Sequence, residues 1–279
     1  MAKRFLVAVV VMMGLVFCGP SWAKEKSEVP AKVKNAIQEM LNKNYKGLEI
    51  VDIWETPIKG VYAVVLENEA FRKNLFMFSG DGKYYFPYNV LLRSGDDENV
   101  VYVEAVKRGA IKLPKGADGT KLVERVNKKM VPYVEGKKPP RDIILYFDPL
   151  DVRSRKEIQR LKELGYKAYL QPMSWMGLPS TKASIFLWSL WKEGKKKEFF
   201  KYLQVDDEEA LKKMVEESKK FNVDDPKYKE MLDEMGKVSF YISNLKVKEP
   251  PLLSIGNELF GGYMGKELLK LHLFPPKTK

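Results

Sequence analysis

The feature that most constrains this chain is an apolar run, an amphipathic helix and a second apolar run in close succession. "DIILYF" (142–147) has the continuous hydrophobicity of a strand that is buried on both faces. "RSRKEIQRLKEL" (153–164) carries its apolar residues on one helical face and is followed by Gly165, a common helix stop. "YKAYLQP" (166–172) is then predicted to form the next strand. This order predicts a parallel β-α-β crossover at the centre of an α/β domain.

The remainder of the second half extends this pattern. Residues 180–243 are predicted to be helical throughout. "PPLLSI" (250–255) and "NELFGGY" (257–263) predict a pair of strands joined by a turn, and "GKELLKLHL" (265–273) predicts a last helix. A β-α-β unit, a helical insertion, a hairpin and a closing helix form the connectivity of a thioredoxin-like α/β domain, which we expect over residues 141–279.

The first half has a different character. "KSEVPAKVKNAIQEMLNKNY" (26–45) has apolar residues at helical spacing, and short β-like runs follow it, two of them around the turn "SGDG". We also expect a strand at "NVVYVEAV" (99–106), because it is rich in β-branched residues; at a sheet edge it could pair with another subunit. Residues 24–106 are therefore predicted to form a small α+β unit, one helix followed by a curved antiparallel sheet.

Residues 107–140 are predicted to join the two units. "TKLVERVNKKM" (120–130) has a helical apolar stripe, with Asp118 or Thr120 as its cap, and "EGKKPP" (135–140) is typical of a boundary. The segment is interpreted as a linker helix, which either spaces the two units or packs on one of them.

The N-terminus has the three parts of a signal peptide. Lys3 and Arg4 precede the apolar run "FLVAVVVMMGLVFC", and Ser21 and Ala23 occupy the −3 and −1 positions of a cleavage site. The run is shorter than the roughly 20 residues that a membrane-spanning helix needs. We therefore expect cleavage after Ala23 (signal peptide 1–23) and export to the periplasm, without stable membrane insertion.

Cysteine and histidine usage excludes several kinds of chemistry. The one cysteine, Cys18, lies within the predicted signal peptide, so the mature chain would have no thiol for a disulfide, a nucleophile or a metal site. The one histidine, His272, cannot by itself build a zinc site or a His-based triad. We expect neither a metal nor a cofactor.

The net charge of +12 raises the question of an anionic partner. The basic residues are spread along the chain and interleaved with acids, as in "VDDEEALKKMVEESKKF" (205–221). This pattern is typical of solvated helix faces, so nucleic acid is not expected as a partner. A weak attraction to anionic membrane surfaces or to acidic polypeptides fits the charge better.

Several segments together resemble the periplasmic disulfide isomerases of the DsbC/DsbG family. They are "DPLD" (148–151), the proline before the third predicted strand, "GNELFGGYMGKELLKLHL" (256–273) and "GVYAVVLENE" (60–69) with the hairpin after it. The resemblance implies a cystatin-like N-terminal dimerisation domain, a linker helix, and a thioredoxin-like domain with its helical insertion at about 180–243. It also implies a periplasmic homodimer.

The family's Cys-x-x-Cys motif falls on residues that are not cysteines. When Asp148 is set on the family's Asp, the two cysteine positions are Asp151 and Ser154, with Val152 and Arg153 between them. The resemblance also places the family's cis-proline at Pro251, with Pro250 in the position usually held by Thr.

The replacement keeps a helix cap and removes the nucleophile. Asp151 can cap the following helix, and Ser154 with Glu157 forms a second capping pattern, S-x-x-E. Because disulfide exchange requires thiolate attack, no catalytic residue is assigned and isomerase activity is not expected by that route. Asp148 and Asp151 also fit an acid–base pair, and Ser154 a hydrolase nucleophile, but no histidine or G-x-S-x-G motif supports hydrolysis.

A peptide-binding surface is predicted beside this degenerate motif. It consists of Pro250 and Pro251 with Met173, Trp175 and Met176, although packing between the strand and the insertion is the simpler explanation of the last three. The predicted function is a redox-inactive, chaperone-like homodimer that holds unfolded or partner polypeptides. The alternative is a regulatory or accessory subunit of a thiol-disulfide system, and an unrelated hydrolase is the least supported class.

Overall fold

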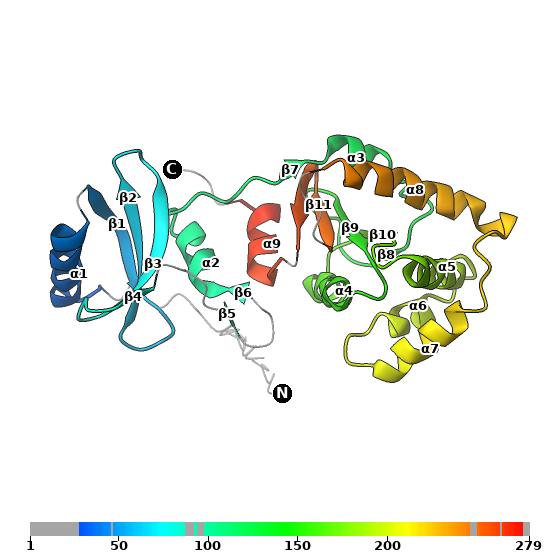
Figure 1. Cartoon of the computed structure of the whole chain (residues 1–279), viewed down its shortest axis with the longest axis horizontal. Coiled ribbons are helices and arrows are strands. Elements are labelled where there is room, and N and C mark those ends of the chain that lie inside the picture. The colour runs from blue at the N-terminus through cyan, green and yellow to red at the C-terminus, as the bar shows by residue number, and fades with distance from the viewer. Residues whose placement is uncertain are drawn as a thin grey trace, which may run out of the picture.

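The structure of the protein is a computed structural model that describes residues 28–45, 47–86, 92–93, 98–245, 250–262 and 264–275. The predicted signal peptide, with Cys18, lies outside these residues. Within the described part of the chain, no helix is long and apolar enough to cross a membrane. Two units follow each other along the long axis of the molecule (Figure 1).

The first unit is a four-stranded antiparallel sheet, in the order β1-β2-β3-β4, covered by a helix on each face. Its strands are β1 (Leu48–Glu55), β2 (Val61–Asn68), β3 (Lys73–Ser79) and β4 (Tyr85–Phe86). Helix α1 (Ala31–Asn44) buries Ile37 and Leu41 against one face. A separate two-stranded pair, β5 (Leu92–Arg93) and β6 (Glu98–Asn99), follows the sheet.

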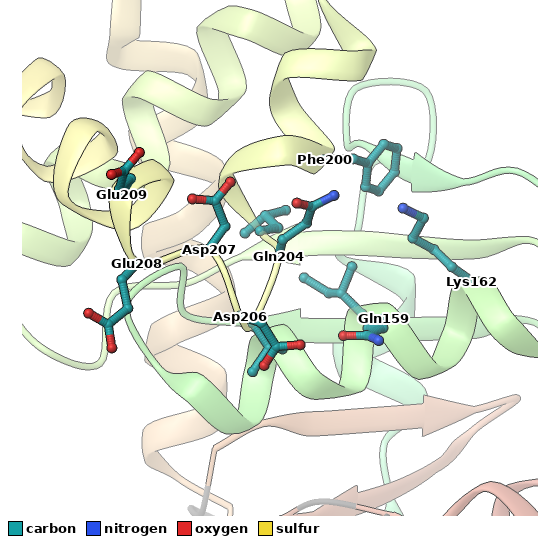
Figure 2. Close-up of a pocket in the computed structure, with 11 residues that line it drawn as sticks. Gln159, Lys162, Phe200, Gln204, Asp206, Asp207, Glu208 and Glu209 are labelled. Atoms are coloured by element: carbon teal, nitrogen blue, oxygen red, sulfur yellow. The ribbon is translucent and has the colours of Figure 1, made fainter. Parts of the chain in front are cut away.

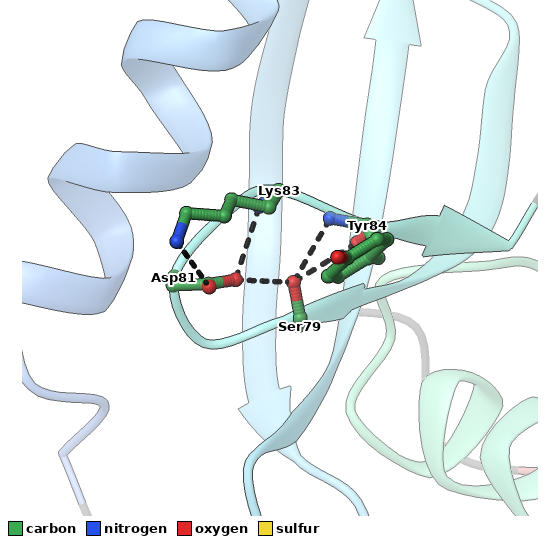
Figure 3. A network of polar contacts seen from close by, with 4 residues as sticks. All are labelled: Ser79, Asp81, Lys83 and Tyr84. Atoms are coloured by element: carbon green, nitrogen blue, oxygen red, sulfur yellow. Dashed lines mark hydrogen bonds and ion pairs between the residues drawn. The ribbon is translucent and has the colours of Figure 1, made fainter.

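The hairpin turn between β3 and β4 is the "SGDG" turn of the sequence, and Figure 3 shows its polar contacts. The Ser79 hydroxyl donates to the Asp81 carboxylate (2.6 Å) and accepts from the Tyr84 backbone N–H (3.0 Å). Asp81 also accepts from the Lys83 backbone N–H at 3.1 Å. These bonds, led by that of Ser79, lower the pKa of Asp81. The turn is thereby fixed by its own side chains, as expected for Ser and Asp in turns.

The strand expected at 99–106 is wrong, because the segment forms helix α2 (Val100–Lys107). Asn99 caps this helix by accepting a hydrogen bond from the Tyr102 N–H at 3.0 Å. Val101 and Ala105 cover the second face of the first sheet, while the opposite side of the helix packs against the second unit. A helix buried on both sides needs apolar residues all round, which explains the strand-like composition.

The second unit is built on a six-stranded sheet in the order β7-β12-β11-β9-β10-β8. Its strands are β7 (Ala117–Asp118), β8 (Tyr133–Val134), β9 (Ile143–Phe147), β10 (Ala168–Pro172), β11 (Leu252–Ile255) and β12 (Glu258–Gly261). β9 and β10 are parallel, and helix α4 (Val152–Leu164) connects them. The antiparallel hairpin β11–β12 and the closing helix α9 (Lys266–Leu273) complete a thioredoxin-like fold, which confirms this part of the sequence prediction.

The helix expected at 120–130 is shorter than predicted, and of the two alternatives for it, spacing the units or packing on one of them, the structure has the second. Helix α3 has five residues (Thr120–Glu124), and the strands on either side of it, β7 and β8, pair with β12 and β10 of the second sheet. Leu122 and Val126 are buried against helix α8 and the sheet. The apolar stripe of this segment therefore belongs to the core of the second unit.

The predicted helical insertion is confirmed. It consists of helices α5 (Leu178–Lys192), α6 (Lys196–Tyr202), α7 (Glu208–Ser218) and α8 (Lys229–Ser243), with a 3₁₀ turn at Pro226–Tyr228. Helices α5, α6 and α7 extend the core on the face of the sheet that α4 and α9 cover. Helix α8 covers the other face with α3.

The two units contact each other through α2 and α9. Val103 and Val106 of α2 are buried with Leu271 of α9. Beside this apolar contact, the Lys107 ammonium lies 2.9 Å from the Glu267 carboxylate. Helix α2, at the end of the predicted N-terminal unit, thus packs against both units.

Alanine in place of glycine at two positions should change the free energy of unfolding in opposite directions. A Cβ at Gly136 would lie 2.5 Å from the Gly165 backbone oxygen, whereas a Cβ at Gly236, inside helix α8, would meet nothing within 4 Å. Gly136→Ala should lower the free energy of unfolding by about 2 kcal/mol, because two backbone segments must separate. Gly236→Ala should raise it by about 0.5–1 kcal/mol through helix propensity. Urea unfolding of the two variants measures both, and equal effects would contradict the close approach.

Candidate functional site

The predicted site residues converge at the carboxyl edge of the parallel strands β9 and β10. In an open α/β sheet, this edge is where ligands usually bind. Leu252 of β11 pairs with Tyr146 of β9, so the register sets Pro251 beside Phe147. The Pro250–Pro251 peptide bond is cis, as the resemblance implied. The cis-proline and the start of α4 therefore lie at one end of the sheet.

The Asp148 carboxylate is the polar centre of this end of the sheet. The residue is 0% exposed. Its carboxylate accepts backbone N–H bonds from Leu150 (2.9 Å), Trp175 (2.8 Å) and Met176 (3.1 Å). The Ser180 hydroxyl lies 2.6 Å from each of its two oxygens. One buried anion thus ties the start of the α4 turn to the 174–177 loop and to helix α5.

Sequence reasoning missed Ser180. Its signal was its position in the first turn of a helix that starts just beyond a strand's carboxyl end. Such a serine is well placed to meet a carboxylate that follows the neighbouring strand.

Asp151 caps helix α4 as predicted. One of its carboxylate oxygens accepts from the Ser154 N–H (2.8 Å) and from the Ser154 hydroxyl (2.9 Å). The Ser154 oxygen also accepts from the Asp148 N–H at 3.2 Å, and Ser154 is 0% exposed. Arg153 lies on the surface with its Nε 3.6 Å from Asp151. The positions of the two family cysteines therefore hydrogen-bond to each other, and the Ser154 hydroxyl is buried and paired with the capping carboxylate.

The second capping pattern, Ser154 with Glu157, is wrong. Glu157 is 1% exposed, and its carboxylate lies against the segment between β12 and α9. One of its oxygens is 3.4 Å from the Met264 N–H and 3.9 Å from the Arg160 guanidinium, while the other has no hydrogen-bond partner. Burial raises the pKa of Glu157 to about 7, because it outweighs the attraction of Arg160.

The predicted peptide-binding residues differ in exposure. Met176 is 58% exposed and Trp175 is half-buried, whereas Met173 is 2% exposed and packs in the core. Pro251 is buried and Pro250 half-buried.

Two further apolar side chains are exposed near Asp148. Val152 begins α4 and is 45% exposed, and Leu178 begins α5 and is 56% exposed. The backbone N–H of Met176, whose side chain is also exposed, is hydrogen-bonded to the Asp148 carboxylate. We call these three exposed residues the apolar rim (Val152, Met176 and Leu178).

His272 and the acidic side chains offer no metal centre. His272 is 2% exposed, its ring centroid lies 4.4 Å from that of Phe260, and burial lowers its pKa to about 4. Among the described residues, no group of three or more His, Cys, Asp or Glu side chains is arranged to hold a metal ion.

A hollow of about 810 Å³ lies between α4 and the connection from α6 to α7. Figure 2 shows the carboxylates of Asp206–Glu209 on one side of it, with Lys162 and Phe200 on the other. Its lining residues do not include those of the degenerate motif or the apolar rim. The pattern of 205–221 is typical of a solvated helix face, and Asp207 caps α7 at its start.

Comparison with known proteins gives similarity at the level of structure. No family model and no curated protein matches the chain. DsbG of Helicobacter pylori is similar at 15% identity over 80% of this chain and 99% of its own, with a TM-score of 0.36. The catalytic domain of Proteus mirabilis ScsC is similar at 16% identity over 56% of this chain and 97% of its own, with a TM-score of 0.44. The Wolbachia pipientis thiol-disulfide exchange protein α-DsbA2 is similar at 16% identity over 63% of this chain and 98% of its own, with a TM-score of 0.44. At these identities the similarity concerns the fold alone.

Replacing the buried carboxylate tests its place at the centre of the site. Asp148→Asn should lower the free energy of unfolding by about 2–4 kcal/mol, because an amide nitrogen would face donors that now bond to a carboxylate oxygen. The exposed Asp206→Asn is the matched control and should change stability by less than about 0.5 kcal/mol. Denaturant unfolding measures both, and equal effects would show that the hydrogen bonds of Asp148 contribute little.

Glu157 predicts a pH dependence of stability. Its folded pKa of about 7 lies above the usual value of a glutamate, so the folded state retains a proton that the unfolded state releases. This contribution is complete below about pH 4 and is lost as the pH rises through 7, by about 3 kcal/mol in all. The free energy of unfolding of Glu157→Gln, relative to that of the wild type, should therefore rise by about that amount between pH 4 and pH 8. Urea unfolding at several pH values measures the gap, and a gap that does not change with pH would contradict the assignment.

Proposed function

We propose that this protein is an exported, redox-inactive relative of the DsbC/DsbG isomerases that binds extended polypeptide segments, acting as a chaperone-like homodimer. The observation that carries the proposal is the arrangement at the end of β9. The family's two cysteine positions are closed in a hydrogen-bonded cap, while apolar side chains beside them remain exposed. A site that cannot attack a disulfide but keeps its apolar surroundings is suited to binding.

The cysteine content of the chain supports redox inactivity. The chain has one cysteine, so an intramolecular Cys-x-x-Cys cycle has no second thiol. Hydrolysis is not favoured either, because the hydroxyl of Ser154 is buried and bonded to Asp151. Export is supported by the signal-peptide pattern that ends at Ala23.

The apolar rim and the neighbouring cis-proline support the binding of an extended polypeptide. Val152, Met176 and Leu178 present aliphatic and thioether surface without a charged group, and methionine adapts to varied partners. Backbone groups at a proline-terminated strand offer pairing to an extended peptide.

The two edge strands of the first sheet, β1 and β4, differ in how open they are to pairing with a second copy. Edge strand β1 carries a bulge between Ile50 and Asp52, and Asp52 is bonded in bidentate fashion to Arg108, which protects that edge. The opposite edge, β4, exposes Tyr85 (41%) and Phe86 (50%). We place the contact with a second copy at β4, in place of the strand expected at 99–106.

An aggregation assay with a cysteine-free client tests the proposal, using the chain from Lys24 onward. The triple variant Val152→Ser, Met176→Ser, Leu178→Ser should suppress aggregation at least about threefold less than the wild type, because apolar contact area is lost. The matched control replaces Ile58, Phe71 and Phe240 by Ser, since these are exposed apolar residues away from the apolar rim, and it should retain activity.

Sedimentation of the same preparations gives the oligomeric state, which must be dimeric for the homodimer to stand. Absence of suppression by the wild type would rule out general client binding. The accessory role in a thiol-disulfide system would then be pursued through a single dedicated partner.

A further inference from the structure

A second hollow shares Lys162 and Phe200 with the hollow of about 810 Å³ described above. It has a volume of about 690 Å³ and is formed by strand β8 and the residue after it, helix α4, the turn from α5 to α6, and helix α6. This size falls within the range of small-ligand sites. We call it the lysine hollow, because four lysines line it: Lys162, Lys195, Lys196 and Lys197.

The lysine hollow is electropositive. The acids among its lining residues are Glu135 and Glu198, against the four lysines, which leaves a net charge of +2. Lys196 is paired with Glu135 at 3.0 Å, and Lys195 is paired with Glu193, outside the lining, at 2.7 Å. The hydrogen bonds to these carboxylates raise the pKa of both lysines, so they stay cationic at neutral pH.

Aromatic rings hold two of the ammonium groups in place. The Lys196 ammonium lies 5.2 Å from the Tyr133 ring centroid and 5.1 Å from that of Trp191. The Lys162 ammonium lies 4.9 Å from the Phe200 ring centroid. Cation–π contacts of this kind restrict lysine side chains that would otherwise be mobile. The cations are therefore partly positioned before any ligand arrives.

The same contacts narrow the class of ligand. Lysine ammonium groups lie over the rings of Tyr133, Trp191 and Phe200. The surface is therefore better suited to binding an anion than to stacking on a base or a sugar. Every cation among the described lining residues is a lysine, which binds a compact anion as a point charge, whereas planar carboxylates are best matched by the arginine fork. The positive net charge of the lining favours an anion. The volume also leaves room for an organic group beside that anion.

We propose that the lysine hollow is a binding site for a phosphate monoester, with the phosphate between Lys162, Lys196 and Lys197 and the organic part in the remaining volume. The ester is either a soluble molecule or the headgroup of a phosphate-bearing lipid. This site is independent of the polypeptide-binding function, because it shares no residue with the apolar rim.

The test uses the full chain from Lys24 onward and two probes, phenyl phosphate and vesicles of phosphatidylcholine with phosphatidic acid. The double variant Lys162→Glu, Lys197→Glu changes two lysines that have no carboxylate partner among the described residues, so no acid is left unpaired. The control Lys32→Glu, Lys34→Glu makes the same change in net charge on exposed positions of α1, in the other unit.

Calorimetric titration should show phenyl phosphate binding to the wild type, weakened at least about tenfold in the first variant and less than about twofold in the control. Binding of phenyl phosphate assigns the site to soluble esters, and binding of the phosphatidic acid vesicles alone assigns it to a headgroup. Circular dichroism checks folding, and Lys162→Gln, Lys197→Gln replaces the charge reversal if that variant does not fold.

Three results would overturn the proposal. They are no binding of either probe to the wild type, an equal loss in both double variants, or binding of citrate as tight as that of phenyl phosphate. The second result would reduce the effect to the net charge of the chain, and the third would remove the preference for phosphate.

Discussion

The hydrogen bonds of the Asp148 carboxylate are the constraint on which the rest of the second unit's functional edge depends. Placing an anion at 0% exposure is costly unless donors surround it. Here the donors come from the start of the α4 turn, from the 174–177 loop and from Ser180 of α5. The backbone of the three segments that surround the degenerate motif is therefore held together at one carboxylate, which keeps the positions of the apolar rim fixed relative to one another while its side chains stay exposed.

Beside this buried anion, the first turn of α4 is hydrogen-bonded by side chains of the chain itself. In the resembling family a thiolate would use the free N–H groups of this helix start, whereas here Asp151 occupies them and also receives the Ser154 hydroxyl. The hydrogen-bonding capacity of the motif is consumed within the chain. What remains accessible is apolar surface, which supports a binding role for an edge that supports chemistry in the family.

The two units are joined more closely than a linker helix would allow. Helix α2 covers the second face of the first sheet and packs against α9, and Arg108 at its end is bonded to Asp52 of the edge strand β1. The β1 edge is thereby protected, while β4, at the opposite edge, keeps exposed aromatic side chains. The lysine hollow lies beside β8, at an edge of the second sheet. The apolar rim, the lysine hollow and β4 are thus three separate surfaces, and each can be altered without the others.

The sequence by itself determined the β-α-β unit, the cap at Asp151 and the lack of a second cysteine, and the resemblance to the DsbC/DsbG family gave the position of the cis-proline at Pro251. The first three depend on periodicity, on side chains that bond to backbone within three residues, and on composition, none of which requires the packed core. Tertiary structure decided that 100–107 is a helix, because both of its sides are buried, and that α3 stops at Glu124, because β8 must rejoin the sheet. It also decided that Glu157 faces Met264 and that Ser180 meets Asp148. Those partners are 107 and 32 residues apart, and only the packed core brings them together.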